Sequence, residues 1–384
     1  MSRFSHGLAL ALAACLIGPL LGCQSGAPAP PPIVAADATA AGPTQASVGP
    51  RGVPGGLSLF GDYPDNEAVP IENRFVSNLK QHTFTTQGLD FDPDVYDADD
   101  LLVFASTRNS EHPDLFLKRI DGSALTQLTS DPADDIQPRF SPDGQRIVFC
   151  SNRGGNWDLW LVNRDGTGLA QLTHEPADEV APCWSPDGAQ LAYMSWGQRS
   201  RQWEVWTLNV TLPGTRRFLA YGMFPAWSPD GRRLALQRAR QRGSHLFSVW
   251  TVDLIDDEAR QPTEVAHSDS AACIAPRWSP DGAMLVYCAV PEGPAADATA
   301  SATPRAADLW VVELSSGLRV KLTDGSSPAF NPIWAADGRI FFVSPRAGTE
   351  NVWSLTSELQ EYVTADRPRA QRAEKPLNTA LAKD

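Results

Sequence analysis

A tryptophan followed by a tight-turn tetrapeptide recurs along this chain, and no other feature constrains its fold as strongly. The sequence Trp-Ser-Pro-Asp-Gly stands at Trp184–Gly188, Trp227–Gly231 and Trp278–Gly282. Phe140–Gly144 is the same unit with a smaller aromatic residue, and Trp334–Gly338 is a less regular copy. Self-similarity at a period of about 40 to 50 residues indicates an array of similar supersecondary units, each needing neighbours to bury its apolar faces.

A second motif, in which a polar residue precedes an aliphatic and an aromatic residue, gives the number of units as six. Its copies are Asp114–Phe116, Asp158–Trp160, Glu204–Trp206, Ser248–Trp250, Asp308–Trp310 and Asn351–Trp353. The long interval before Asp308 holds an insertion rich in alanine and proline, residues 291–307, which belongs to the fifth unit. We also interpret Phe91–Asp94 as a distant copy of the turn, preceding the first unit's second strand.

Each unit predicts four short antiparallel strands. Apolar runs such as Ile147–Phe149 follow the turns, whose proline and Asp-Gly have the dihedral preferences of a tight connection between two strands. The polar–aliphatic–aromatic motif marks a third strand, and pairs such as Leu172–Thr173 end a fourth. The pattern predicts an all-β fold, a six-bladed β-propeller of four-stranded antiparallel blades over residues 71–364, preceded by a disordered linker.

Closing the array into a ring removes the exposed sheet edges of an open array. Closure usually builds one blade from both chain ends. Arg74–Thr83 is strand-like and precedes the first unit, whereas no clear Leu-Thr strand follows Trp353. We therefore expect Arg74–Thr83 to supply the outer strand of blade six, with Glu361–Thr364 as the alternative.

The repeat resembles the WD40-like β-propeller repeat, or PD40 repeat, of TolB-type proteins. The likeness rests on Pro-x-Trp-Ser-Pro-Asp-Gly, on Ser151–Gly155 and on Ser106–Asn109, and it extends over roughly residues 74–357. The resemblance implies a propeller that serves as a scaffold, a sensor or the non-catalytic half of a peptidase. TolB itself carries an α/β domain before its propeller, whereas a stretch rich in proline and alanine stands at that place here.

Residues 1–22 have the features of a lipoprotein signal peptide. Arg3 precedes the apolar run Leu8–Leu21, which is too short for a comfortable membrane span. The run ends in Leu-Leu-Gly-Cys, similar to a bacterial lipobox, so we expect a lipid on Cys23; the alternative is an ordinary secretory signal with an incidental cysteine. By family analogy, Gln24 places the anchored protein on the periplasmic side of the outer membrane if the source is Gram-negative.

The remaining segments and the net charge limit the partners of the chain. Residues 23–70 hold the lipidated cysteine and a linker rich in proline and alanine, and residues 365–384 form a polar tail. The formal net charge of −13 makes binding to nucleic acid or to an anionic lipid surface unfavourable. We expect a monomer that contacts the membrane through its lipid anchor only.

The cysteines leave two interpretations open. Cys273 and Cys288 flank the turn at Trp278–Gly282 on adjacent strands, one step out of direct opposition, and the compartment is oxidising. A disulfide between them is one interpretation, and buried thiols are the other. No spacing of the kind used by zinc sites occurs.

The connections from the fourth strand of one blade to the first strand of the next provide the candidate binding face. We expect these loops to open near the mouth of the central channel, where clustered carboxylates would hold a calcium ion or a basic partner segment. The alternative is a solvated acidic rim. The candidate residues are Asp134, Asp135, Asp178 and Glu179, together with Arg139 and Arg277, which share a register on innermost strands and would pair with the carboxylates.

The sequence favours a non-catalytic protein. The histidines are scattered singly, no Gly-x-Ser-x-Gly motif occurs, and the turn aspartates stand in strict register. We expect a lipid-anchored cell-envelope scaffold, without an obligatory cofactor, that binds a protein or an envelope polymer through its propeller face. The alternative is an envelope lyase or hydrolase with a metal at the channel mouth. A carbohydrate-binding module is a third interpretation, for which Trp196 and Trp203 are the candidate aromatic residues.

Overall fold

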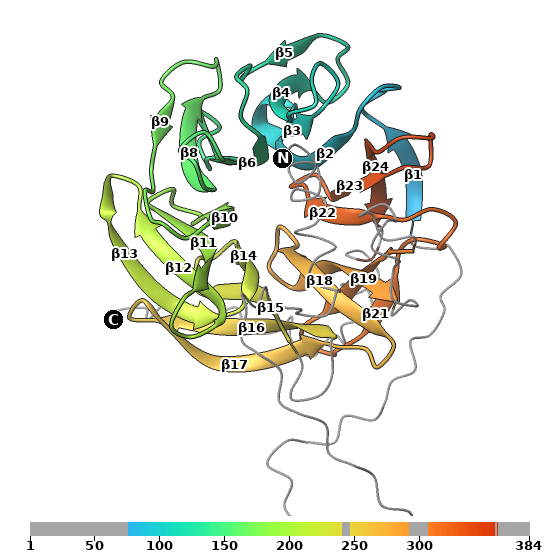
Figure 1. Ribbon diagram of the computed structural model, residues 1–384. Helices are drawn as coiled ribbons and strands as arrows, with labels where there is room; N and C mark the ends of the chain where they lie inside the picture. The colour runs from blue at the N-terminus through green and yellow to red at the C-terminus, as the bar shows by residue number, and fades with distance from the viewer. Residues whose placement is uncertain (1–75, 240–245, 292–305, 358, 360–384) are drawn as a thin grey trace, which may run out of the picture. The chain divides into compact units, whose positions relative to one another are not determined.

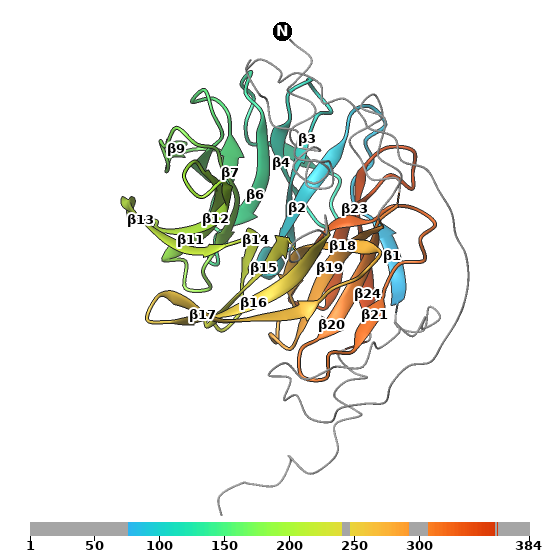
Figure 2. The same cartoon turned by 60° about the horizontal axis from the view of Figure 1, so that its bottom comes forward.

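A computed structural model describes residues 76–239, 246–291, 306–357 and 359 of the chain. These residues form six four-stranded antiparallel sheets, as the repeat predicts. Figures 1 and 2 show the sheets arranged as blades around a centre, with strands β2, β6, β10, β14, β18 and β22 innermost. The innermost strand of each blade contacts its two neighbours, β2 and β22 included, so the ring is closed.

The blades follow one another in chain order. Blade one contains β2 (Asp90–Tyr96), β3 (Leu101–Ser106), β4 (Asp114–Arg119) and β5 (Leu125–Gln127), with the 3-10 helix η1 (Asp97–Asp99) between its first two strands. Blade two contains β6 (Asp135–Phe140), β7 (Arg146–Ser151), β8 (Asp158–Asn163) and β9 (Ala170–Gln171). Blade three contains β10 (Glu179–Trp184), β11 (Gln190–Gly197), β12 (Gln202–Asn209) and β13 (Leu212–Tyr221).

The second half repeats the arrangement. Blade four contains β14 (Met223–Trp227), β15 (Arg233–Ala239), β16 (Phe247–Ile255) and β17 (Glu258–Ala266). Blade five contains β18 (Ala271–Trp278), β19 (Met284–Pro291), β20 (Asp308–Glu313) and β21 (Arg319–Lys321). Blade six contains β22 (Phe330–Trp334), β23 (Arg339–Ser344), β24 (Asn351–Ser357) and β1 (Val76–Gln81).

Strand β1 closes the ring, which confirms that the segment before the first unit supplies the outer strand of blade six. It pairs antiparallel with β24, from Val76 opposite Ser357 to Gln81 opposite Trp353. The buried His82 extends the closure, because its backbone N–H donates to Val352 and its ring nitrogens lie 3.2 Å from the Ile120 carbonyl oxygen and 2.8 Å from Ser354 Oγ. Arg74, Phe75 and the alternative segment 361–364 lie outside the described residues.

The repeated turn is held by its serine and aspartate side chains. Ser185 Oγ accepts a hydrogen bond from the Gln190 N–H at 2.9 Å and donates one to Asp187 at 2.6 Å. Gly188 has a φ of +70°, a conformation that costs glycine least. The same serine–aspartate hydrogen bond recurs at Ser141, Ser228 and Ser279. The same hydrogen-bonded turn therefore connects the first two strands in four of the blades.

The turn tryptophans fill the space between blades. The indole Nε1 of Trp184 donates to the carbonyl of Arg139 at 3.1 Å, and that of Trp278 donates to Ala226 at 2.9 Å. Both hydrogen bonds reach back to the innermost strand of the preceding blade. Burying these large side chains at the two junctions supplies apolar contact that joins the blades there.

Each innermost strand carries a β-bulge that the sequence analysis did not predict. In all six strands the pairing register shifts by one residue next to a proline, and the residue before that proline has a φ between +50° and +55°. These residues are Asp92, Gln137, Ala181, Phe224, Ala275 and Asn331. A bulge turns the local backbone out of regular pairing and therefore re-aims the side chains beside it.

The interpretation of Phe91–Asp94 as a turn was wrong. Asp94 pairs with Val103 in β2 and β3, as Arg139 pairs with Val148 in blade two, so this segment is the bulge of an innermost strand. Both this segment and the turn at Phe140–Asp143 read Phe-x-Pro-Asp, and this likeness caused the misalignment. The turn of blade one is instead η1, which ends at Asp99 and is followed by Asp100 with a φ of +53°.

Cys273 and Cys288 do not form a disulfide. The register opposes Cys273 to Ala289 and Cys288 to Ile274, so the two side chains point to opposite faces of the sheet. The interpretation as buried thiols holds. Trp196 and Trp203 oppose each other in the hairpin of β11 and β12, with ring centroids 5.5 Å apart, and both are half-buried.

Several sequence predictions lie outside the described residues. These are the signal peptide at 1–22, the lipidated cysteine and linker at 23–70, most of the insertion at 291–307, and the tail at 365–384. Strands β19 and β20 end and begin at Pro291 and Asp308, as expected for an insertion between them. Among the described residues no helix has the length and apolarity needed to cross a bilayer.

Candidate functional site

The carboxylates predicted to form a binding face are mostly internal contacts. Asp135 is fully buried and accepts two hydrogen bonds from Arg153, at 2.7 and 2.8 Å. The Arg153 guanidinium also stacks over Trp160 at 4.9 Å, which fixes its position. Blade one repeats the arrangement with Asp90 and Arg108. A carboxylate neutralised in this way holds the sheet together and is not available to a partner.

The neighbouring acidic residues have local roles too. Asp134 is buried, with its carboxylate 2.6 Å from His112 Nδ1 and 3.1 Å from the amide nitrogen of Asn152. Asp178 is exposed and accepts a hydrogen bond from the backbone N–H of Trp157 at 3.1 Å. The prediction that these loops present an open acidic cluster was wrong, because three of the four carboxylates are buried within or between blades.

Glu179 departs from the pattern of the first two blades. It is fully buried and pairs with Ser195 in the register that Asp135 and Ser151 have in blade two. The position matching Arg153 is Gly197, where a Cβ atom would stand 2.1 Å from Ser200 Oγ and 2.2 Å from Glu204 Oε1. Burial, as the largest cause, raises the pKa of Glu179 to about 8.

Arg139 and Arg277 do not pair with those carboxylates. Both point from their bulges toward the central axis, where Asp92 and Asp94 are the acidic neighbours. Arg139 Nη1 donates to the carbonyls of Pro93 and Pro138 at 3.2 and 2.7 Å. The prediction that the two arginines share a register was correct, but the bulges direct them into the channel.

Burial dominates the electrostatics of this axial cluster. It raises the pKa of Asp92 to about 6 and also raises that of Asp94, although Arg139 opposes both changes. It lowers the pKa of Arg277 to about 10, and repulsion from Arg139 adds to that change. Two buried atoms of the cluster, Asp92 Oδ2 and Arg139 Nε, have no hydrogen-bond partner among the described residues. The axis therefore holds unused donor and acceptor capacity.

The channel widens toward the face that carries the repeated turns. Around the bulges the cavity measures only about 20 Å³, whereas the mouth on the turn face measures about 360 Å³. Arg139, Arg277 and Asp94 line the mouth together with the aromatic residues that begin the turns. Those aromatic residues are Phe140, Trp184, Trp227, Trp278 and Trp334. We call this cavity the turn-face mouth.

The site predicted from the sequence lies on the opposite face and does not include Asp92 or Asp94. The available signal was the proline two residues before each repeated aromatic residue, since it marks the bulge that turns Arg139 inward. The described residues contain no group of three or more His, Cys, Asp or Glu side chains placed to hold a metal ion. This part of the chain therefore offers no such group for the calcium ion that the sequence led us to expect.

Comparison with known proteins agrees with the fold. Residues 92–247 and 158–370 match the profile of the Tricorn protease N-terminal beta propeller domain, and the chain belongs to this family. It is a TolB-like propeller protein, as the repeat predicts. A TolB homolog protein of Chlorobium luteolum is 30% identical over 115 residues, which cover 29% of this chain and 25% of the relative. The chain spans about a quarter of the length of the curated relatives that it matches.

Two solved structures show the same fold at low identity. A putative TolB from Agrobacterium tumefaciens is 18% identical with a TM-score of 0.52, and the match covers 72% of this chain and 95% of that one. An oligogalacturonate lyase from Vibrio parahaemolyticus is 12% identical with a TM-score of 0.51, and the match covers 72% and 93%. At such identities the likeness concerns the fold alone.

Proposed function

We propose that this chain is a non-catalytic, lipid-anchored protein of the bacterial cell envelope that binds an extended segment of another protein at the turn-face mouth. The observation that carries the proposal is the composition of that mouth. Aromatic and proline side chains form its wall, and two arginines stand at its base. Aromatic walls contribute large contact areas at a low cost in conformational entropy, which is typical of protein-binding surfaces.

The arginines supply directional contacts at the base of the mouth. Arg277 Nη1 lies 3.4 and 3.5 Å from its nearest carbonyl acceptors, which are long hydrogen bonds, and Arg139 Nε has no partner among the described residues. A backbone carbonyl or a carboxylate of a bound segment would satisfy these donors. Because Asp94 lines the mouth beside them, the base of the mouth offers an acceptor to the segment's N–H groups as well.

The anchor and the location belong to the same proposal. A lipid on Cys23 and a linker over residues 23–70 would hold a monomeric propeller at the periplasmic side of the outer membrane. The likeness of this chain to TolB-type proteins supports an envelope role. Labelling with radioactive palmitate tests the anchor, with Cys23→Ser as the control; absence of label on the native chain would contradict it.

Site-specific photocrosslinking tests the binding face. A benzophenone side chain at Pro229, an exposed residue of the mouth, is expected to capture one partner protein in the native membrane. The matched position is His174, which is exposed at the opposite end of the blades. We expect no adduct from His174 and a strongly reduced adduct from Pro229 in the Arg139→Gln and Arg277→Gln double variant. Equal adducts from both positions, or none from Pro229, would refute the proposal.

The enzyme alternative has its own test. A lyase or hydrolase that uses a metal at the channel mouth would retain manganese or zinc in stoichiometric amount after purification. We expect no stoichiometric manganese or zinc in the purified full-length protein. Finding either metal at one ion per chain would favour the enzyme, and the lyase of similar fold would then suggest the first substrates to try.

A further inference from the structure

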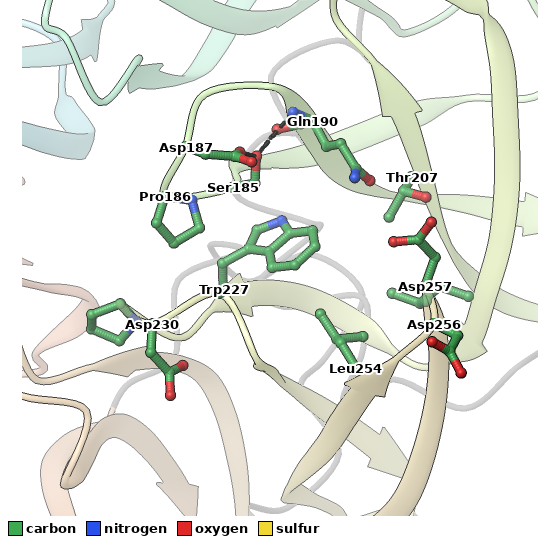
Figure 3. Close-up of a pocket in the computed structure, with 13 residues that line it drawn as sticks. Ser185, Pro186, Asp187, Gln190, Thr207, Trp227, Asp230, Leu254, Asp256 and Asp257 are labelled. Carbon is green, nitrogen blue, oxygen red and sulfur yellow. Dashed lines mark hydrogen bonds between the residues drawn. The ribbon is translucent and has the colours of Figure 1, made fainter.

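A second cavity, of about 470 Å³, opens beside the turn-face mouth between blades three and four. Figure 3 shows the Trp227 indole between the turn at Ser185–Asp187 and Leu254, with Asp256 and Asp257 across from it. We call this cavity the interblade cleft. It lies next to the turn-face mouth, with which it shares four lining residues: Ser185, Pro186, Trp227 and Pro229.

Trp227 is the exception among the repeated Trp-Ser-Pro-Asp-Gly tryptophans. Trp184 and Trp278 each donate their indole N–H to a carbonyl of the preceding blade. The buried Nε1 of Trp227 has no hydrogen-bond partner in the described part of the chain, and its ring lines the interblade cleft instead. A buried indole N–H without an acceptor is costly, and a ligand oxygen that reached it after a small movement of the ring would remove that cost.

Two further polar side chains of the cleft are unused. Thr207 is only 7% exposed, and its hydroxyl makes no hydrogen bond with any described residue. The side-chain carboxamide of Gln190 makes none with them either, and Figure 3 shows it extending toward Thr207. Ser185, by contrast, uses its buried hydroxyl to hold its own turn. The wall therefore carries hydrogen-bonding groups that the fold itself does not need.

The charge of the cleft is strongly negative. Asp187 and Asp230 each use Oδ1 to hold their turns, which leaves Oδ2 of each for other contacts. Asp256 and Asp257 form the tip of the β16–β17 hairpin, with φ values of +51° and +60°. The one basic side chain that forms an ion pair with these four carboxylates, among the described residues, is Arg217, 3.4 Å from Asp257, and both partners are more than half exposed.

We propose that the interblade cleft binds a lysine or arginine side chain carried by the same extended polypeptide that occupies the turn-face mouth. The inference rests on the proposed function and gives its partner a chemical character, a basic segment. Four carboxylates attract the cation, the Trp227 ring faces it, and a backbone carbonyl beside it accepts the orphaned indole N–H. A neutral saccharide would also stack on Trp227, but it would leave the four negative charges without a counterpart.

The experiment follows the Trp227 indole N–H resonance of the full-length protein by NMR, assigned with Trp227→Phe. The basic probe is acetylated tetralysine amide, and the saccharide probe is a β-1,4-linked tetramer of N-acetylglucosamine. We expect tetralysine to shift the Trp227 resonance and the saccharide to leave it unchanged. Binding should weaken about three- to tenfold in the Asp256→Asn and Asp257→Asn double variant, and further at higher salt.

The control variant replaces another pair of adjacent, exposed aspartates, which lie at the turn between the first two strands of a different blade. Asp99 and Asp100 lie at the turn of blade one, outside both cavities, and each forms an exposed ion pair. Their double substitution by asparagine removes the same charge and should leave tetralysine binding within about twofold of the native protein. Equal weakening in both double variants, no shift of Trp227, or a shift by the saccharide alone would overturn the inference. The proposed function is judged separately, because the Pro229 crosslink does not depend on any of these results.

Discussion

Asp158 and Glu179 face each other across the junction of blades two and three, close enough for one hydrogen bond to join their side chains. While both are ionised, no described residue donates a hydrogen bond of regular geometry to Asp158 Oδ1 or to either oxygen of Glu179, and the Thr173 hydroxyl beside Glu179 only partly opposes the rise of its pKa. One proton on Glu179 supplies that donor. Blade three therefore neutralises its buried carboxylate with a proton, where blade two uses Arg153.

Because of this proton on Glu179, the stability of the folded protein should depend on pH, and the substitution Glu179→Gln should remove that dependence. The folded-state pKa of Glu179, about 8, lies above its ordinary value of 4.5, so the folded state holds one more proton between these values. The contribution to stability is complete below pH 4.5 and is lost as the pH rises through 8. Glu179→Gln, which keeps an N–H donor, should match the native melting temperature at pH 4.5 and exceed it at pH 8.5. Thermal unfolding monitored by circular dichroism measures both; a lower melting temperature at pH 8.5 would contradict the shared proton.

The Arg153–Asp135 pair should matter far more than an exposed pair of similar length. Arg153→Met leaves the fully buried Asp135 without its bidentate partner and should cost about 3 kcal/mol of unfolding free energy. Lys80 and Asp121 are 2.6 Å apart but more than half exposed, so Lys80→Met should cost less than about 1 kcal/mol. Urea denaturation at pH 7 gives both values, and similar costs for the two variants would show that burial is not the deciding variable.

Two turn glycines of equal backbone conformation should respond differently to alanine. Gly144 and Gly188 have φ values of +65° and +70°, so each substitution carries a backbone cost of about 1 kcal/mol. At Gly144 the new Cβ would stand 2.3 Å from the ring of Tyr96, whereas at Gly188 its nearest neighbour is Pro142 at 3.5 Å. Gly144→Ala should therefore melt several degrees below Gly188→Ala. Equal melting temperatures would mean that the Tyr96 ring moves aside without cost.

The closure of the ring should loosen in acid. Burial lowers the pKa of His82 to about 4, below its ordinary value of 6.5, so the folded state resists protonation of this residue. Its contribution is present above pH 6.5 and is lost as the pH falls through 4. In His82→Gln the melting temperature should depend less on pH between 6.5 and 4 than it does in the native protein. Parallel curves for the two proteins would place the acid sensitivity elsewhere.

The thiols of Cys273 and Cys288 should be reduced and protected. Both are buried on opposite faces of their sheet, and burial raises the pKa of the Cys288 thiol. We expect neither cysteine to react with a maleimide in the folded protein, and both to react after denaturation without a reductant. Peptide mapping by mass spectrometry identifies the labelled residues. A Cys273–Cys288 cross-linked peptide would revive the disulfide interpretation.

The architecture was predictable because short, local sequence motifs determine where its strands and turns lie. The tight turn at Trp184–Gly188 and its copies fix where strands reverse, and the motif at Asp158–Trp160 counts the blades. Strand β1 was found in the same way, since a strand without a partner before the first unit has to close the last one. These inferences need only neighbouring residues and the rule that sheet edges are covered.

The site required the tertiary structure, because pairing between distant residues decides what a side chain does. Asp135 and Glu179 look alike in the sequence, yet Arg153 neutralises one of them and Gly197 leaves no arginine for the other. The bulges at Asp92 and Gln137 turn charged residues toward the axis. A prediction that assumes strict alternation of side chains between the two faces of a strand misses such a shift. The sequence by itself determined the number and order of the blades. Only packing between blades, which brings together residues far apart in the chain, decided which charges form ion pairs inside the fold and which stay exposed.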